Sequence, residues 1–363
     1  MNQPPLARVM ICDDSAIIRA ALARMLDSQP AIAVVAKVAN GEMALAEMRR
    51  QFQARTPIDV VVLDIEMPVM DGMRALPMLL KIDPNVRIIM ASTLTTRGAD
   101  IALQALRLGA ADYLPKPGTA DIADDSFRRD LVAKITGLAR LRSLRTQPAV
   151  TPKSFVAMLR PLPRQVPRLL AIGSSTGGPQ ALFTFIQALG ADFPVPVVLT
   201  QHMPATFTPI LADHLTRLGG MKCAEAVDGE RLVAGHIYLA PGDRHLLVHG
   251  SAAGLIVRVT SDPPENFCRP AVDPMLRTAN AACDGRVLVV MLTGMGQDGL
   301  LGTRAIVEGG GAALAQDEAS SVVWGMPGAI ARAGLCHQVL PLPAIAARVR
   351  EIFQSAPIRR AAS

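Results

Sequence analysis

The sequence predicts an α/β protein with two domains, each built on a doubly wound, mainly parallel β-sheet. The chain has 363 residues, which is more than one domain of ordinary size contains. In both halves, short apolar runs typical of buried strands alternate with stretches whose apolar residues recur at helical spacing. Half of the residues are hydrophobic and only 3% are aromatic, so we expect two cores made of aliphatic side chains.

Residues 7–118 contain five strand–helix repeats, which predict a (βα)5 domain. Strands are expected at the apolar runs 7–12, 31–38, 58–65, 86–92 and 111–116. Helices are expected at 15–26, 41–50, 74–82, 99–109 and 121–143. The run 58–65 is apolar almost throughout, which is typical of a central strand in a parallel sheet.

A second alternation begins at Leu169. Its main strands are expected at 168–175, 195–202, 286–296 and 311–316, and its helices at 179–189, 208–218, 272–283 and 299–310. A stretch richer in β-structure is expected between them, with short strands at 222–227, 235–242, 244–250 and 254–260. Residues 146–167 contain five prolines and no sustained periodicity, so we interpret them as a linker.

Charge and cysteine content restrict the function classes. The net charge is +6, partly concentrated in residues 128–168, which we interpret as a solvated helix and linker and not as a nucleic-acid-binding surface. The five cysteines are widely spaced and form no C-x-x-C pair, so neither a disulfide framework nor a zinc site is expected. Without a signal-peptide pattern or an apolar run of about 18 to 20 residues, the chain is expected to be cytoplasmic and not membrane-embedded.

Polar residues follow the expected strands of the first half, at the edge where parallel sheets bind ligands. Asp13 and Asp14 end the first strand, Asp64 ends the third, and Ser92 and Lys116 follow the fourth and fifth. Clustered carboxylates repel one another unless a cation lies among them, and hard oxygen ligands suit Mg²⁺. A carboxylate can also attack phosphorus, and a cation, an ammonium group and a hydroxyl can then stabilise the phosphoryl oxygens.

Taken singly, these features have ordinary explanations. The Asp13–Asp14 pair is typical of a helix cap, and Asp71–Gly72 is typical of a turn. Their occurrence together at four strand ends favours a shared phosphoryl-transfer site.

The whole set resembles the receiver domain of two-component response regulators, a flavodoxin-like fold, with LDIEMPVMDG at 63–72, Thr93 and Pro117 as further matches. The resemblance implies that a histidine kinase is the phosphodonor and that Asp64 is the phosphorylated residue. The Mg²⁺ ligands that it implies are Asp13, Asp14, Asp64 and the main-chain carbonyl of Glu66. The residues that it implies for sensing the phosphate are Ser92, Lys116 and the switch aromatic Tyr113.

A serine, a histidine and an aspartate lie at strand ends in the second half. Ser174 and Ser175 end the first strand in the segment GSSTGGP, His202 ends the second, and Asp298 follows the strand expected at 286–296. A catalytic triad is defined by geometry and not by chain order, so this set is compatible with a serine hydrolase. The residues alone leave both serines open as the nucleophile.

The residues around the serines fit an exposed nucleophile on a sharp strand-to-helix turn. Gly177 and Gly178 are small neighbours, and Pro179 suits the first turn of a helix. Amides at such a helix start can face an oxyanion. A phosphate-binding turn is the alternative for this segment, although it lacks the lysine of a P-loop.

Several other polar residues are interpreted as structural. His202 is distinguished because it ends an apolar strand, while the remaining histidines are His214, His236, His245, His249 and His337. Asp243 in PGDR is interpreted as a turn residue, and Asp273 as the N-cap of the helix at 272–283.

Residues from about 169 to 353 resemble the catalytic domain of the chemotaxis protein-glutamate methylesterase family, CheB. The segments that carry the resemblance are IGSSTGGP, LTQHMP, APGDRH, RPAVD, LTGMGQDG and AQDEASSVVWGMP. It implies an α/β hydrolase-type domain in which Ser175, immediately before Thr-Gly-Gly, is the nucleophile. His202 is then the general base, Asp298 orients it, and the backbone at Thr176 and Met295 forms the oxyanion hole.

Together the two resemblances imply a phosphorylation-regulated enzyme of chemosensory adaptation. It would hydrolyse glutamate methyl esters on chemoreceptors with release of methanol, and deamidate selected glutamines. Mg²⁺ would serve the receiver, and the hydrolase would need no cofactor. The expected boundaries are a receiver at 1–125, a helix and Pro/Arg-rich linker at 126–167, a catalytic domain at 168–355 and a tail at 356–363.

Two alternatives remain open from the sequence. A receiver-controlled serine hydrolase with another ester or amide substrate would carry the same triad. A DNA-binding response regulator is supported only by the basic charge, since we find no helix-turn-helix pattern.

Overall fold

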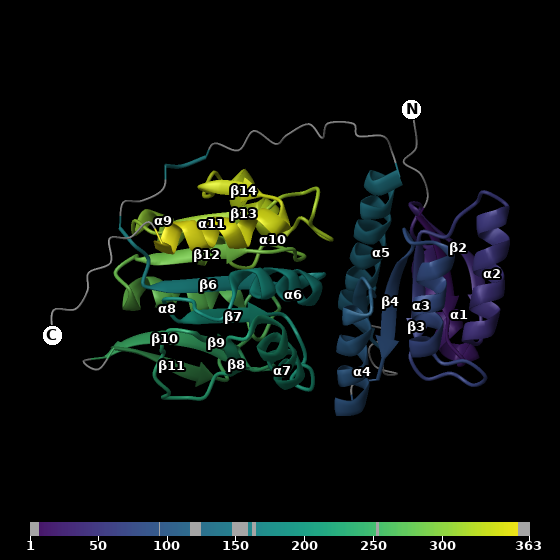
Figure 1. Cartoon of the computed structure of the whole chain (residues 1–363), viewed down its shortest axis with the longest axis horizontal. Helices are drawn as coiled ribbons and strands as arrows, with labels where there is room; N and C mark the ends of the chain where they lie inside the picture. The colour runs from purple at the N-terminus through teal and green to yellow at the C-terminus, as the bar shows by residue number, and fades with distance from the viewer. Residues whose placement is uncertain are drawn as a thin grey trace. The chain divides into compact units, whose positions relative to one another are not determined.

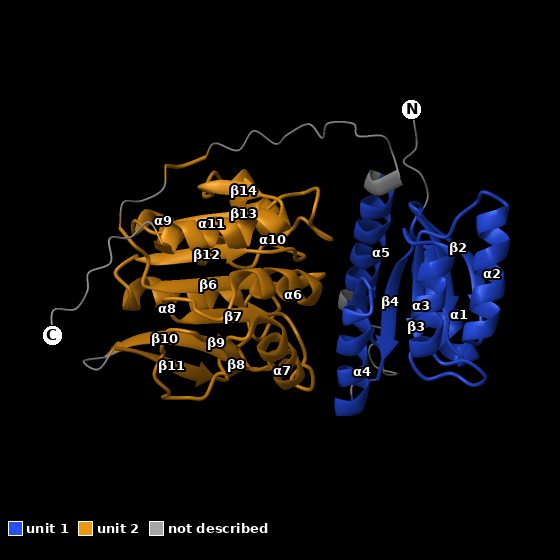
Figure 2. Cartoon of the chain, viewed as in Figure 1, with its two compact units in different colours: residues 1–152 blue, residues 153–363 orange. Residues whose placement is uncertain are grey.

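The chain forms two compact units, residues 1–152 and 153–363 (Figure 2). The computed structural model describes residues 7–93, 95–116, 125–146, 159–161, 165–251 and 254–354. The expected tail lies outside the described residues, as do 147–158 and 162–164 of the expected linker. None of the helices in the described part of the chain is long and apolar enough to cross a membrane.

Unit 1 alternates strands and helices as the sequence predicts (Figure 1). Its strands are β1 (Ala7–Cys12), β2 (Ile32–Val38), β3 (Val60–Asp64), β4 (Arg87–Ser92) and β5 (Asp112–Pro115). Its helices are α1 (Ala16–Asp27), α2 (Gly41–Gln53), α3 (Gly72–Ile82), α4 (Thr96–Arg107) and α5 (Asp125–Thr146). All pairings are parallel, in the order β2-β1-β3-β4-β5, which confirms the (βα)5 prediction.

Polar side chains fix where the first four helices of unit 1 begin. The capping residues are Ser15, Asn40, Asp71 and Thr95. Each accepts a hydrogen bond from the amide three residues later, which satisfies one of the free amides at a helix start. The Asp13–Asp14 pair is therefore not the cap of α1. Asp13 instead accepts the Ser15 amide at 2.8 Å, at the carboxyl end of β1.

Helix α5 corrects one expectation about the basic residues. We expected the cations of residues 128–168 to be solvated, but Lys134 and Arg142 are buried. The Lys134 ammonium lies 2.7 Å from an oxygen of buried Asp112, and Arg142 pairs with Asp59 at 3.0 Å and Asp83 at 2.8 Å. These cations fasten α5 to the sheet of unit 1, since a buried charge requires a partner of opposite sign.

Unit 2 contains nine strands and six helices within the described residues. Its strands are β6 (Leu169–Ser174), β7 (Val197–Gln201), β8 (Lys222–Glu225), β9 (His236–Leu239), β10 (His245–Ser251), β11 (Gly254–Thr260), β12 (Val287–Met291), β13 (Ala312–Gln316) and β14 (Gln338–Leu340). Its helices are α6 (Gly178–Leu189), α7 (Thr208–Gly219), α8 (Val272–Ala282), α9 (Leu300–Glu308), α10 (Met326–Arg332) and α11 (Leu342–Gln354).

Seven strands of unit 2 form one parallel sheet in the order β14-β13-β12-β6-β7-β9-β8, which confirms a doubly wound fold. Strands β10 and β11 form a separate antiparallel hairpin. Three elements, α10, β14 and α11, were not predicted from the sequence. Because β14 pairs with β13, the strand expected at 311–316 is not the edge of the sheet.

Strands β6 and β12, near the centre of the unit 2 sheet, are buried along their whole length. Helices α6, α7 and α11 pack side by side, and α8 packs with α9 and the β10–β11 hairpin (Figure 1). Buried aliphatic residues of β6, β12, β13 and α8 belong to one core. Strand β6 lies between β7 and β12, so the sheet order reverses there, and ligands bind at such reversals in parallel sheets. In unit 1 the same reversal lies at β1, between β2 and β3.

We predict that Lys134→Met lowers the free energy of unfolding of unit 1 by about 3 kcal/mol, because it removes the ammonium group that neutralises buried Asp112. Urea-dependent hydrogen exchange of unit 1 peptides measures this change. Arg129→Met, on the exposed face of α5, is the matched control and should cost less than about 1 kcal/mol. Equal losses in the two variants would contradict the role of the Lys134–Asp112 pair.

Candidate functional site

The first site lies at the reversal of the unit 1 sheet. Carboxylate oxygens of Asp13, Asp14 and Asp64 all lie within 4.8 Å of one another. Asp13 and Asp64 are buried, while Asp14 is exposed. The Lys116 ammonium reaches both buried carboxylates, at 3.0 Å from Asp13 and 2.7 Å from Asp64. The structure therefore brings four of the predicted residues together.

The electrostatics of this cluster favour an added cation. Burial, together with the charge of Asp13, raises the pKa of Asp64 to about 6 against the opposing effect of Lys116. A divalent cation would offset the repulsion among these carboxylates, and three oxygen donors at this spacing are the kind of ligand set that Mg²⁺ takes. Glu66 lies next to the cluster, with its amide 3.3 Å from Asp64 Oδ1 and its side chain exposed.

The remaining residues predicted for this site lie on β4 and β5. Ser92 is buried, its hydroxyl donates to the Thr93 carbonyl at 3.0 Å, and its carbonyl accepts the Lys116 amide at 2.7 Å. Tyr113 is also buried, with its ring 5.6 Å from the Lys134 ammonium. An open cleft beside the cluster is lined in part by Asp14, Glu66 and Arg97.

The second site is built on the turn between β6 and α6. The Ser174 side chain is fully buried, and its hydroxyl donates to Gln201 Oε1 at 2.6 Å. Ser175 is partly exposed, its amide donates to the Thr293 carbonyl at 3.0 Å, and its carbonyl accepts the Gln201 side-chain amide at 3.0 Å. The turn thus gives the Ser174 hydroxyl an internal partner and leaves Ser175 at the surface of the site.

Glycine is required at two points around Ser175, one on this turn and one on the loop after β12. Gly177 has φ +74°, and a Cβ there would collide with the side chain of Val322. At Gly294 a Cβ would lie 2.9 Å from Ser175 Cβ and 2.5 Å from Met326 Sδ. The loop that follows β12 therefore passes directly against Ser175.

The two backbone segments predicted to form an oxyanion hole flank Ser175. Thr176 follows it and is buried, and its carbonyl accepts the Thr293 hydroxyl at 2.9 Å. Met295 follows Gly294 on the loop after β12 and is partly exposed.

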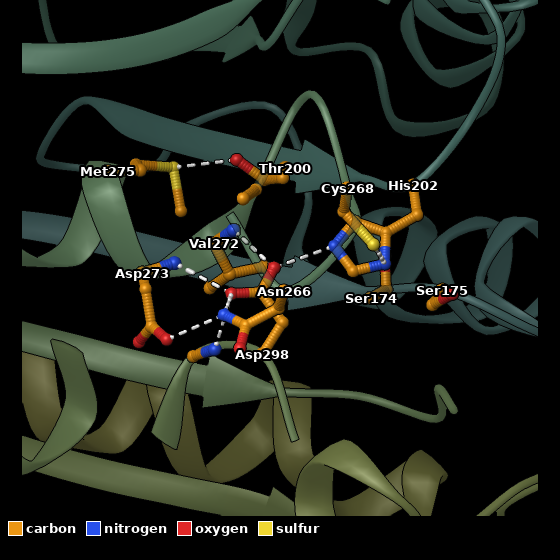
Figure 3. A network of polar contacts seen from close by, with 12 residues as sticks. Ser174, Ser175, Thr200, His202, Asn266, Cys268, Val272, Asp273, Met275 and Asp298 are labelled. Carbon is orange, nitrogen blue, oxygen red and sulfur yellow. Dashed lines mark hydrogen bonds and ion pairs between the residues drawn. The ribbon is translucent and has the colours of Figure 1, made fainter. Parts of the chain in front are cut away.

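His202 and Asp298 form a pair beside the turn. His202 Nε2 lies 2.8 Å from Asp298 Oδ2, and Nδ1 lies 3.5 Å from Cys268 Sγ. Ser175 lies on the side of the imidazole away from Asp298 (Figure 3). Nε2 is thus engaged by Asp298, and Nδ1, in contact with Cys268 Sγ, is the ring nitrogen that lies away from the carboxylate.

Asp298 receives hydrogen bonds from several parts of unit 2. Its Oδ2 also accepts the Val272 amide at 2.6 Å, and its Oδ1 accepts the amides of Asp273 at 3.1 Å and Gly299 at 2.9 Å. The side-chain amide of Asn266 donates to the same Oδ1 at 2.9 Å. The carboxylate thus caps the N-terminus of α8 from outside that helix.

This capping corrects the prediction for Asp273. The N-cap of α8 is Ala271, whose side chain has no polar group, and Asp273 lies in the first turn of the helix. Its carboxylate instead accepts the Gly302 amide of α9 at 2.6 Å. The prediction was wrong because the acceptor that satisfies the α8 amides comes from a distant segment.

The charge state of the pair follows from these contacts. Burial opposes charging of the imidazole, but its hydrogen bonds to Asp298 and Cys268, together with the charge of Asp298, outweigh burial and raise the pKa of His202 above its ordinary value. Burial also opposes the Asp298 carboxylate, yet its bonds to His202 and to the α8 amides outweigh that effect and lower the pKa of Asp298. Asp298 is therefore ionised and favours a protonated His202.

Three of the other histidines and Asp243 have structural roles, as expected. His245 and His337 are buried and accept main-chain amides, and His214 is buried against Phe183. His249 is exposed on β10, and His236 lies 3.3 Å from the Ala234 carbonyl. Asp243 lies in a turn with φ +62°.

Three residues of the second site were missed by the sequence analysis: Gln201, Asn266 and Cys268. Gln201 had a usable signal, because a polar residue immediately before His202 at the end of a buried strand is unusual. Asn266 and Cys268 lie in a loop far from any strand end. Their proximity to Asp298 and His202 depends on the path of that loop and has no signal in the sequence.

Comparisons with known proteins find a family match for each of the two units. The family model described as "Response regulator receiver domain" matches residues 9–124, and "CheB methylesterase" matches residues 170–349. The solved catalytic domain of Thermotoga maritima CheB methylesterase is 37% identical, with a TM-score of 0.50, over 52% of this chain and 100% of that one.

Relatives match along nearly the whole length. Paramagnetospirillum magneticum protein-glutamate methylesterase/protein-glutamine glutaminase 1 is 51% identical, over 93% of this chain and 94% of that protein. The enzyme of the same name from the group 2 operon of Rhodospirillum centenum is 52% identical, over 95% and 93%. The chain belongs to the CheB family of protein-glutamate methylesterases/protein-glutamine glutaminases, with a response-regulator receiver domain and a methylesterase domain in one polypeptide.

Proposed function

We propose that this protein demethylates glutamate methyl esters on chemoreceptors, deamidates selected glutamines there, and does so under the control of phosphorylation at Asp64. The observation that carries the proposal is the partly exposed Ser175 on a strand-to-helix turn, beside the partly buried His202 that is paired with buried Asp298. The names of the full-length relatives supply the substrate class. They favour this function over another hydrolase substrate and over a DNA-binding response regulator.

Ser175 acts as the nucleophile. Its Oγ attacks the carbonyl carbon of the γ-glutamyl methyl ester while His202 Nδ1 takes the hydroxyl proton. Asp298, bonded to Nε2, holds the ring in place and stabilises the imidazolium that forms. The Ser174 hydroxyl, bound to Gln201, supports the turn.

The amides at Thr176 and Met295 stabilise the oxyanion of the tetrahedral intermediate. The intermediate collapses as His202 gives its proton to the leaving methoxy group, so methanol departs and an acyl-enzyme remains. Water, deprotonated by His202, then releases the glutamate. For a glutamine substrate the leaving group is ammonia.

Unit 1 receives the phosphoryl group from a chemosensory histidine kinase on Asp64. Asp13, Asp14, Asp64 and the Glu66 carbonyl would hold Mg²⁺, which would neutralise charge among the carboxylates and phosphoryl oxygens. Lys116 and Ser92 contact the phosphoryl group, and Tyr113 responds to it as the switch aromatic. The added negative charge shifts the conformation of unit 1, which regulates the esterase.

We predict that Ser175→Ala lowers kcat for methanol release from methylated chemoreceptors by at least about 10³-fold, because the nucleophile is lost. Ser174→Ala is the matched control. It removes one buried hydrogen bond and should change kcat by less than about tenfold. Loss of activity in Ser174→Ala with retention in Ser175→Ala would reverse the assignment.

The pH dependence follows from the raised pKa of His202. The general base must be neutral, so activity rises as the pH increases through that pKa. We expect the midpoint of the acid limb in the kcat/KM–pH profile to lie above the ordinary imidazole pKa of about 6.5. A kcat/KM profile at constant ionic strength measures it, and Asp298→Asn should move the limb to lower pH. A wild-type midpoint at or below this value would contradict the effect of Asp298 on the pKa of His202.

A further inference from the structure

Asn266 joins two buried carboxylates beside the proposed triad. Its side-chain nitrogen donates to Asp298 Oδ1 at 2.9 Å and to Asp273 Oδ2 at 3.0 Å (Figure 3). The two aspartates are 2% and 1% exposed. Both hydrogens of one carboxamide are thus used to hold together two groups of like charge.

The same two carboxylates connect helices α8 and α9. Asp298, which precedes α9, accepts the Val272 and Asp273 amides at the start of α8. Asp273, on α8, accepts the Gly302 amide at the start of α9. Each helix start is therefore capped from the other segment, and the Asn266 carboxamide lies between the two caps.

The turn that carries Asn266 has a backbone conformation that suits asparagine. Glu265 and Cys268 exchange main-chain hydrogen bonds at 3.1 and 2.8 Å, with Asn266 and Phe267 between them. These two residues have φ +51° and +62°. Asparagine adopts this left-handed conformation more readily than most residues. The side chain of Phe267 is fully exposed, so the turn is held by Asn266 and not by burial of its neighbour.

Several titratable and charged groups from different elements surround Asp298. His202 faces it from the end of β7, Asp273 from α8, and Cys268 contacts the far nitrogen of the imidazole. The pKa of Arg277 on α8 is raised by its hydrogen bond to Glu265, at 2.6 Å, and also by the charges of Asp273 and Asp298. Burial raises the pKa of Asp273, and the charge of Asp298 adds to this effect.

We propose that Asn266 and Asp273 are positioning residues for the esterase reaction, which fix the Asp298 carboxylate oxygen that faces His202. The inference rests on the proposed function of Ser175, His202 and Asp298. Neither residue contacts the imidazole. Asn266 withdraws negative charge from Asp298 through its hydrogen bond, and Asp273 adds negative charge beside it, so the two act on His202 with opposite sign.

Two variants test this proposal in the full chain. Asn266→Gly keeps the left-handed backbone at little cost and removes only the carboxamide. We expect it to lower kcat about tenfold with little change in KM, and to raise the pH of the acid limb, because Asp298 then attracts the imidazolium more strongly. Asp273→Asn should lower the pH of the limb, because a negative charge is removed. Asn280→Ala, on helix α8 with Asp273, is the control and should change neither kcat nor the pH of the acid limb.

An NMR titration of the His202 imidazole in each variant, assigned with His202→Gln, reports the same two shifts without substrate. Shifts of opposite sign in Asn266→Gly and Asp273→Asn support the proposal. Unmoved titrations, or losses of activity that only follow loss of folded protein, overturn it. If the wild type releases no methanol while the titration shifts appear, the proposed function fails and the coupling of these residues to His202 stands.

Discussion

The Asp298 carboxylate is the group on which the proposed active site depends. A buried charge is tolerated only when hydrogen bonds replace the water that it loses. Asp298 meets this requirement with donors from α8, from the start of α9, from the Asn266 turn and from His202. Because one carboxylate satisfies all of them, the positions of these segments and of the imidazole are fixed together.

The two units place their sites at the same point of the fold, but the chemistry of the two sites differs. Each places acidic residues where the order of a parallel sheet reverses, beyond the carboxyl ends of central strands. In unit 2 the acidic oxygens are occupied by N–H donors, so the charge serves to orient an imidazole. In unit 1 one oxygen of Asp13 and one of Asp64 face the Lys116 ammonium, and the other oxygens accept main-chain amides, which leaves the cluster suited to a cation and a phosphoryl group.

Much of the fold and of the two sites could be predicted from the sequence, because both sites lie at strand ends and strand ends follow apolar runs. The Ser174–Ser175 pair, His202, Asp64 and Lys116 follow from strand ends, and the choice of Ser175 rests on the family resemblance. Contacts that depend on loop paths could not be predicted. Asn266 reaches Asp298 across a turn, and Asp273 caps a different helix from the one that contains it. Similarly, the charge of Lys134 suggested a solvated helix, whereas its burial depends on pairing with Asp112.

The most direct test of the central claim is methanol release from membranes that contain methylated chemoreceptors, with Mg²⁺, in the presence and absence of a small phosphodonor. We expect release by the full chain that increases with phosphodonor, and release by Asp64→Asn that does not. Equal stimulation of Asp64→Asn would contradict the phosphorylation site, and no release by the unaltered chain under either condition would contradict the methylesterase function itself.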